Sequence, residues 1–248
     1  HKPKEFIYAN PTYKITKAQL NKFQKLVKRR EKGEPIAYLT GHKEFYGLDF
    51  IVNRHVLIPR PDTETLIDYV ITACRDAIYR VSTPVIVDLG TGSGNIAITL
   101  KRELPNASVI ASDISDQALK VARRNANKLK TKITFYKSNV LKDVPKKYCG
   151  KIDWLICNAP YLTKREANKQ SLRYEPQLAL TPKHDSLSII EQVIQQSLTF
   201  LSPTGRIVLE IGYNQAERIK KITRKIYPHC KVTIIKDYAQ LDRVVVIC

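Results

Sequence analysis

A glycine-rich turn after an apolar run could hold the polar end of a small ligand. The run Val85–Val87 leads into residues Asp88–Gly94, which read Asp-Leu-Gly-Thr-Gly-Ser-Gly. Glycines permit positive φ and let backbone N–H groups approach a ligand closely, and the helix that follows adds the positive end of its dipole. The spacing is not the Gly-x-Gly-x-x-Gly of dinucleotide enzymes, so the ligand need not carry phosphates. The carboxylate tail of S-adenosylmethionine suits the same turn. The candidate ligand-binding residues here are Gly90, Thr91, Gly92, Ser93 and Gly94.

Polar residues after the next two predicted strands would complete a nucleoside site. Asp113 stands at the end of the next strand, where a carboxylate can accept hydrogen bonds from both ribose hydroxyls. Asn139 and Val140 follow the third strand and would meet the edge and face of an adenine. The structural alternatives are a tight strand–helix turn without a ligand and, for Asn139, an ordinary polar loop residue. The glycine turn together with Asp113 favours a nucleoside-type cofactor, S-adenosylmethionine.

A second motif is suited to holding a planar amino group. Asn158-Ala159-Pro160-Tyr161 follows the apolar run Trp154–Cys157, 45 positions after Asp113. An amide nitrogen is a poor nucleophile, so its two N–H bonds must be held, and the Asn158 side-chain oxygen and the Ala159 carbonyl are two acceptors. Pro160 stiffens the turn, and the Tyr161 ring can lie against a planar group. The alternative is an ordinary Asn-x-Pro turn. The candidate catalytic residues are Asn158, Pro160 and Tyr161, and the candidate substrate-binding residues are Asn158, Ala159, Pro160 and Tyr161.

From residue 62 onward, strands alternate with helices, which predicts an α/β fold with a doubly wound, seven-stranded, mostly parallel sheet. Ligands bind outside the carboxyl ends of the strands in such sheets, where both motifs lie. The predicted strands are 85–89, 108–112, 133–137, 153–157, 206–211, 231–236 and 243–247, and the predicted helices are 63–79, 94–104, 116–129, 187–201 and 215–226.

The first part of the chain differs from the rest. Thr16 and Gln19 form a capping-box pattern at the start of a helix that Gly33 and Pro35 end. Short strand-like runs at 45–46, 50–52 and 56–58 follow, and prolines then break the pattern. We therefore expect a small, partial helical domain over 1–40, a hairpin and linker over 41–61, and the α/β domain over 62–248.

The composition restricts the compartment and the partners. The chain of 248 residues carries 42 Lys and Arg against 23 Asp and Glu, a net charge of +19. This excess favours contact with nucleic acid or an acidic partner, although it also fits a lysine-rich composition spread over solvated helix faces. The five cysteines lack metal-ligand spacing, which predicts reduced thiols in a cytosol-like compartment and no metal site. No apolar run is long enough for a membrane helix. The chain starts at His1 without any methionine, which suggests a processed product or a fragment.

Several further stretches resemble the PrmC/HemK family of glutamine methyltransferases, which modify the Gly-Gly-Gln glutamine of peptide-chain release factors. The resemblance runs nearly end to end, and the Ile-Pro-Arg-Pro-x-Thr-Glu segment is its most specific part. The matching stretches are Gly33–Tyr38, Phe45–Phe50, Val56–Glu64, Asp88–Gly94, Tyr174–Leu180, Leu209–Gly212 and Asp242–Val245.

The resemblance implies a Rossmann-like methyltransferase whose helical N-terminal domain docks the release factor. It implies that Gly90 to Gly94, Asp113, Asn139 and Val140 hold S-adenosyl-L-methionine, and that residues 158–161 hold the glutamine amide. Arg60 and Glu64 would shape the pocket or else form a helix cap and a surface ion pair. Tyr174–Pro176 would form a lid or else a structural turn. The implied compartment is a bacterial-type cytoplasm, with an organelle that has bacterial-type translation as the alternative.

Two positions depart from the family pattern. Ala159 stands where the family usually has proline, and Asn139 stands where it often has an acidic residue. Enzymes that methylate amino groups of bases tolerate an aliphatic residue at the first of these positions. The alternative hypothesis is therefore an amino methyltransferase acting on a base in RNA or DNA, which the net charge also favours. A non-catalytic binding module is a third possibility, disfavoured by the intact glycine turn and Asn158.

Overall fold

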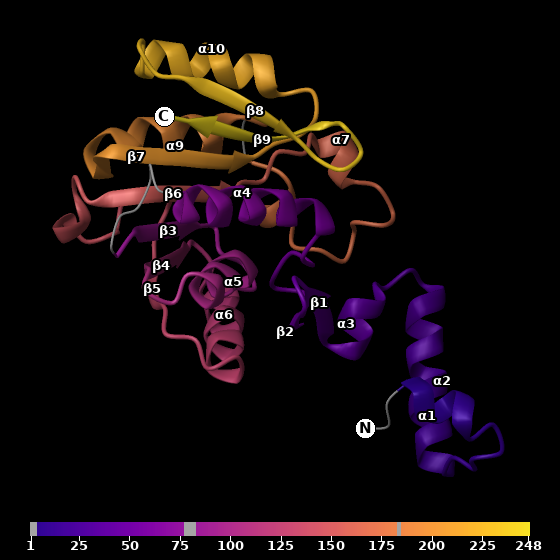
Figure 1. Cartoon of the computed structure of the whole chain (residues 1–248). Helices are drawn as coiled ribbons and strands as arrows, with labels where there is room; N and C mark the ends of the chain where they lie inside the picture. The colour runs from indigo at the N-terminus through magenta and orange to yellow at the C-terminus, as the bar shows by residue number, and fades with distance from the viewer. Residues whose placement is uncertain (1–3, 77–82, 183–184) are drawn as a thin grey trace.

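A single seven-stranded sheet organises most of the chain (Figure 1). This computed structural model describes residues 4–76, 83–182 and 185–248. The strand order is β5-β4-β3-β6-β7-β9-β8, and only β9 runs antiparallel to its two neighbours. The predicted doubly wound, mostly parallel sheet is therefore confirmed. The strands are β3 (Val85–Leu89), β4 (Ser108–Asp113), β5 (Thr134–Lys137), β6 (Ile152–Asn158), β7 (Leu201–Glu210), β8 (Val232–Lys236) and β9 (Asp242–Ile247).

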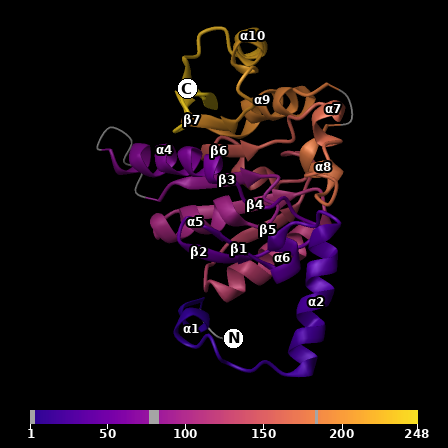
Figure 2. The ribbon, with the colours of Figure 1, turned by 90° about the vertical axis from the view of Figure 1, so that its right-hand side faces the viewer.

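Both faces of the sheet are buried, which explains the continuous apolar runs of the central strands. In β6, Trp154 and Ile156 point into one core while Leu155 and Cys157 point into the other. The first core is covered by α4 (Glu64–Arg75), α5 (Asn95–Glu103) and α6 (Asp116–Lys128), and the second by α9 (Ser188–Phe200) and α10 (Ala216–Ile226). Figure 2 shows α4 and α9 on opposite sides of the sheet. Two layers of helices thus fix the sheet and the loops at its edge.

The predicted helices agree with these elements to within one residue, with one exception. The helix predicted over 63–79 begins at Glu64, after the 3₁₀ turn η1 (Pro61–Thr63), and ends at Arg75; residues 77–79 lie outside the described part of the chain. Several short helices carry no periodic pattern and were not predicted. These are α1 (Lys4–Ala9), α3 (Ile36–Thr40), α7 (Lys164–Ala167), α8 (Gln177–Leu180) and the 3₁₀ turn η3 (Lys146–Tyr148).

The N-terminal helices extend away from the sheet (Figures 1 and 2). Helix α2 (Lys17–Glu31) has the predicted capping box, because Thr16 and Gln19 exchange hydrogen bonds between side chain and backbone. Its apolar residues share one face, yet Leu20 is 40% exposed and Phe23 is 60% exposed. The described residues therefore leave this face of α2 open to solvent. No helix among them is long and apolar enough to cross a bilayer.

A hairpin links these helices to the sheet. Strands β1 (His42–Phe45) and β2 (Leu48–Ile51) pair around Tyr46 and Gly47, which both have positive φ, as a tight two-residue hairpin turn requires. The Asn125 side chain in α6 exchanges two hydrogen bonds with the backbone of Ile51, at 2.7 and 2.9 Å. This contact docks the hairpin on the α/β unit.

The strand predicted at 56–58 was wrong. The Val56 N–H turns back to the Asn53 carbonyl, and the Ile58 N–H donates to the Glu175 carboxylate. Both side chains are buried, so the apolar pattern reflects packing and not membership of a sheet. Pro59 supplies no N–H to continue a ladder.

Candidate active site

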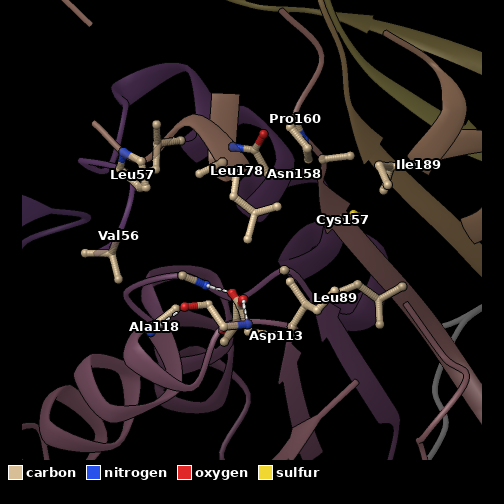
Figure 3. Close-up of a pocket in the computed structure, with 18 of the residues that line it drawn as sticks. Val56, Leu57, Leu89, Asp113, Ala118, Cys157, Asn158, Pro160, Leu178 and Ile189 are labelled. Carbon is tan, nitrogen blue, oxygen red and sulfur yellow. Dashed lines mark hydrogen bonds between the residues drawn. The ribbon is translucent and has the colours of Figure 1, made fainter. Parts of the chain in front are cut away.

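The two sequence motifs meet at the point where the chain reverses its winding direction. Strands β3 and β6 are neighbours, with Leu89 paired to Cys157, while β4 and β7 continue the sheet on opposite sides. The loops at the carboxyl ends of β3 and β6 therefore part and leave a crevice, the usual ligand site of such sheets. A cavity of about 390 Å³ fills it (Figure 3). This volume lies within the usual range for small-molecule sites.

Most of the predicted site residues line this cavity, and two do not. Gly94 and Tyr161 are the exceptions, since Gly94 packs beneath the turn and Tyr161 lines a second, smaller cavity. The predicted residues that line the larger cavity are Gly90, Thr91, Gly92, Ser93, Asp113, Asn139, Val140, Asn158, Ala159 and Pro160.

The glycine turn needs its glycines for two different reasons. Gly90, Gly92 and Gly94 have φ of 67°, 55° and 82°, which side chains rarely tolerate. A Cβ at Gly94 would also lie 3.0 Å from the Ile98 side chain, whereas one at Gly90 would meet nothing within 4 Å. The Cβ at Gly94 would also lie 3.3 Å from Ala122, so Gly94 allows the start of α5 to pack closely on α6, and Gly90 leaves room at the cavity.

Hydrogen bonds brace the turn in this shape. The Thr91 N–H donates to the Ser112 carbonyl over 2.9 Å, and the Thr91 hydroxyl donates to Asp88 Oδ2 over 2.6 Å. Asp88 is completely buried, and burial raises its pKa to about 7. The Gly92 N–H donates to Asp113 Oδ2 over 2.9 Å. The turn is thus held in shape by its own neighbours.

Asp113 lies beside the turn with its carboxylate oriented. Oδ2 accepts from the Gly92 N–H and Oδ1 accepts from the Ser115 N–H, each over 2.9 Å (Figure 3). Each oxygen of a carboxylate has capacity for a further hydrogen bond, so this group can still accept two hydroxyls of a ligand. Burial raises the pKa of the Asp113 carboxyl. The structure thus pairs a nearly buried, fixed acceptor with the glycine turn.

Val140 adopts an unusual conformation at the cavity wall. Its φ is 56°, in the left-handed region that β-branched residues avoid. Its side chain is buried, whereas neighbouring Asn139 is exposed and lines the cavity. Strained backbone of this kind persists where surrounding packing fixes it, often at a ligand site.

The Asn158 side chain lines both cavities. Its Nδ2 donates to the Thr63 hydroxyl over 3.3 Å, and that hydroxyl donates to Glu210 Oε2 over 2.6 Å. Among the described residues, no group donates a hydrogen bond to the Asn158 Oδ1 or to the Ala159 carbonyl. Two neighbouring residues that line the larger cavity thus each have an acceptor without a donor in the described part of the chain. Figure 3 shows the Asn158 side chain at this cavity. Such a pair of acceptors can hold the two N–H bonds of a planar amino group.

Two family descriptions match the chain. Residues 74–174 match the methyltransferase small domain, and residues 1–41 match the PrmC N-terminal domain. A release factor glutamine methyltransferase of Enterococcus faecalis is 42% identical over 216 residues, covering 86% of this chain and 75% of the relative.

This chain belongs to the release factor glutamine methyltransferase family.

Other relatives of the family are longer. A bifunctional methyltransferase of Rickettsia typhi is 41% identical over 241 residues, which is 90% of this chain but 46% of the relative. The chain spans about half the length of such bifunctional relatives. Among solved structures, a methyltransferase of Pyrococcus furiosus superposes with a TM-score of 0.56 at 18% identity, over 89% of this chain and 97% of the other. That likeness supports the fold.

Tyr161 of this family member faces away from the larger cavity. It lines an adjoining cavity of about 110 Å³ together with Leu172 and Glu210, and its hydroxyl donates to Glu210 Oε1 over 3.3 Å. Burial raises the pKa of the Tyr161 phenol. Gln215 Nε2 donates to the Tyr161 carbonyl over 3.1 Å and so braces the end of the Asn158–Tyr161 turn.

The segment before α4 closes the cavity from the other side. Arg60 lines both cavities and pairs with the buried carboxylate of Glu175, which also accepts from the Ile58 N–H. Pro176 then lines the larger cavity. Glu64 instead accepts from the Tyr46 N–H over 3.0 Å and fixes the hairpin. Of the two residues considered for shaping the pocket, the structure brings Arg60 to it.

Sequence reasoning missed Thr63 and Glu210 as site residues of this family member. Both are nearly fully buried, and their hydrogen bond joins the start of α4 to the end of β7. One signal was available: Glu210 ends the apolar run Ile207–Leu209 at the carboxyl end of a central strand. An acidic residue there requires a partner or a function, because burying an unpaired charge is costly.

Proposed function

We propose that this chain transfers a methyl group from S-adenosyl-L-methionine to the side-chain amide nitrogen of the Gly-Gly-Gln glutamine in peptide-chain release factors. Family membership supports the reaction class. The observation that carries the proposal is a pair of acceptors without donors among the described residues, the Asn158 Oδ1 and the Ala159 carbonyl, in two residues that line the same cavity as Asp113. An amide NH₂ is complementary to that pair.

The cavity fits the proposed methyl donor, which supplies an electrophilic methyl group on a sulfonium sulfur when bound. Asp113 would accept the ribose hydroxyls with its two remaining acceptor sites. Asn139 and Val140 would meet the adenine, and the turn from Gly90 to Ser93 would hold the carboxylate end. Gly94 would support this site indirectly, because it allows α5 to pack closely below the turn.

The chain's own contribution to the reaction is positional. The amide nitrogen is weakly nucleophilic because its lone pair is delocalised into the carbonyl, so it must be held toward the methyl group. Asn158 and Ala159 would hold its two N–H bonds, and Pro160 would keep the turn rigid. Orientation of two bound reactants lowers a barrier by up to about 7–11 kcal/mol. Acceptors aimed at positive charge developing on the nitrogen add to this effect.

A base in RNA or DNA is the second candidate substrate. The same acceptor pair suits the exocyclic amino group of a flipped base, and the net charge of +19 favours a polyanion. Membership of the release factor glutamine methyltransferase family favours the protein substrate. That proposal also locates the protein where bacterial-type translation occurs, in a cytoplasm or an organelle.

Methyl transfer from labelled S-adenosylmethionine tests both candidates in parallel reactions. The acceptors are a purified release factor, its Gln→Ala variant at Gly-Gly-Gln, transfer RNA and duplex DNA. Label on the intact release factor alone supports the proposal. Label on nucleic acid with none on the protein assigns Asn158 to holding a base and overturns the release factor assignment.

A further inference from the structure

We propose that Glu210 and Thr63 are positioning residues that set the orientation of the Asn158 side-chain amide. Neither residue is assigned a role by the proposed function above, on which the catalytic consequence of this inference rests. The question they answer is why the NH₂ of Asn158 is occupied while its oxygen is left free to accept from a ligand. The two ends of an asparagine amide have nearly the same shape, so packing alone discriminates poorly between them.

The three side chains come from three elements that only the folded sheet brings together. Asn158 ends β6 and Glu210 ends β7, and the two are paired neighbours in the sheet. Thr63 enters from η1, in front of α4. Its hydroxyl lies 2.6 Å from Glu210 Oε2 and 3.3 Å from Asn158 Nδ2. Within the described hydrogen bonds, Thr63 is thus the only side-chain link between these two carboxyl-end residues.

The direction of each hydrogen bond follows from the groups involved. A carboxylate only accepts, and a threonine hydroxyl has one hydrogen to donate. Because Thr63 donates that hydrogen to Glu210, it can only accept from Asn158. Asn158 must therefore turn its NH₂ toward Thr63, which leaves its Oδ1 without a donor among the described residues.

Glu210 is held as the acceptor at the end of this chain. Its Oε1 accepts from the Tyr161 hydroxyl over 3.3 Å, while Oε2 accepts from Thr63. The Tyr161 hydroxyl has no other hydrogen-bond partner among the described residues. Each oxygen of Glu210 therefore accepts from one hydroxyl, Oε1 from Tyr161 and Oε2 from Thr63. Burial raises the pKa of the Glu210 carboxyl, and these two donated hydrogen bonds oppose that rise.

A reversed Asn158 amide would oppose the reaction. Its NH₂ would face the N–H bonds of the substrate amide, so two donors would meet and one N–H would lose its acceptor. Unpaired buried donors are costly, and a substrate nitrogen that is not held rotates away from the methyl group. The effect should fall on turnover, since Asp113 and the glycine turn lie outside this chain of bonds.

The test uses two near-isosteric substitutions and a matched control in the full chain. Glu210→Gln replaces a carboxylate, which only accepts, with an amide, which can also donate. Thr63→Val removes the hydroxyl and keeps the shape of the side chain. Thr65→Val is the control, because the Thr65 hydroxyl is buried two positions away without a hydrogen-bond partner in the described part of the chain. Thr63→Ser restores the hydroxyl.

The expected result is a loss of kcat of about 10- to 100-fold in Glu210→Gln and in Thr63→Val, the usual range for residues that orient a reacting group. The affinity for S-adenosylmethionine should stay within about twofold in both. Thr65→Val should retain wild-type turnover, and Thr63→Ser should recover most of it. Because one hydroxyl mediates the effect, adding Glu210→Gln to Thr63→Val should cost little more.

A structural readout separates this inference from the proposed function. In nitrogen-15-labelled protein, the side-chain NH₂ signal of Asn158 is the one lost in Asn158→Ala, and it should shift in Thr63→Val but not in Thr65→Val. If the wild type methylates no release factor while this signal responds, the proposed function fails and the positioning role stands. An unmoved signal, unchanged kcat, or equal losses of turnover and cofactor affinity in Thr63→Val would overturn the positioning role.

Discussion

The Thr63 hydroxyl donates a 2.6 Å hydrogen bond to Glu210 across 147 positions of the chain. This bond joins the turn before the first helix of the α/β unit to the end of its fifth sheet strand in chain order. Since β7 pairs with β6, it also brings the buried carboxylate beside Asn158. The candidate substrate clamp therefore depends on residues that are remote from its own motif.

Asn158→Ala is expected to abolish turnover and to leave cofactor affinity nearly unchanged. The substitution removes one of the two acceptors for the substrate amide, while Asp113 and the glycine turn keep their own hydrogen bonds. Calorimetric binding of S-adenosylmethionine and labelled methyl transfer measure the two effects separately. Asn127→Ala, on the exposed side of α6, is the control. A parallel fall in binding and activity would contradict the division of roles.

Asp113→Asn is expected to weaken S-adenosylmethionine binding by about 10- to 100-fold and to lower the free energy of unfolding by about 1–3 kcal/mol. The amide NH₂ would face either the Gly92 or the Ser115 N–H, so one backbone donor would lose its partner. Asp116→Asn, on the exposed start of α6, should change stability by less than about 1 kcal/mol. Binding at wild-type affinity in Asp113→Asn would remove Asp113 from the proposed ribose site.

The sheet was predictable because the same signal is repeated in its central strands. Strands such as β3 and β6 are buried on both faces and therefore read as unbroken apolar runs between turn residues. The failure at 56–58 has the same origin. Val56 and Ile58 are equally apolar and are also buried, and Val56 packs with Ala118 and Val121 of α6, but neither residue belongs to a strand. Periodicity cannot separate the two cases.

The candidate site was predictable only where its residues form local motifs. The glycine turn and Asn158–Pro160 lie on the cavity because strand ends of a parallel sheet meet at one edge. Thr63 and Glu210 gave no local pattern, since their contact depends on strand order and on the path of the chain before α4. Tyr161 was expected to face the substrate, and its placement in the adjoining cavity follows from its bond to Glu210.

Val140 should reverse the usual stability order of alanine and glycine. At φ of 56°, a Cβ is strained, so Val140→Gly should be more stable than Val140→Ala by about 1 kcal/mol. Val121 is a matched control, since it is buried inside helix α6, and there the alanine variant should be the more stable by about 1 kcal/mol. Urea unfolding of the four variants measures both differences. The same order at both sites would mean that Val140 carries no backbone strain.

The net charge of +19 predicts salt-sensitive recognition of the substrate. If the basic surface attracts an acidic partner, kcat/KM should fall severalfold as the salt concentration rises from about 0.05 to 0.3 M, because screening shortens the reach of surface charges. The kcat value at saturating substrate should change little, since the cavity contacts are short-range. Salt-independent kcat/KM would make the charge a feature of composition and not of recognition.

Asp88 should make the protein less stable as the pH rises. Burial raises its pKa from 3.8 to about 7, so the folded state binds a proton more tightly than the unfolded chain. The contribution of Asp88 to the free energy of unfolding is complete below about pH 4 and is lost as the pH rises through 7. Between these values the free energy of unfolding falls by up to about 1.4 kcal/mol per pH unit.

Asp88→Asn mimics the protonated acid. The amide oxygen can accept from Thr91 and Ala97, and the amide NH₂ replaces Oδ1, which has no partner among the described residues. Relative to the wild type, this variant should therefore gain stability from pH 4.5 to 7.5 in urea unfolding, where contributions of all other groups cancel in the difference. A constant difference across that range would show that Asp88 does not titrate between the two pH values.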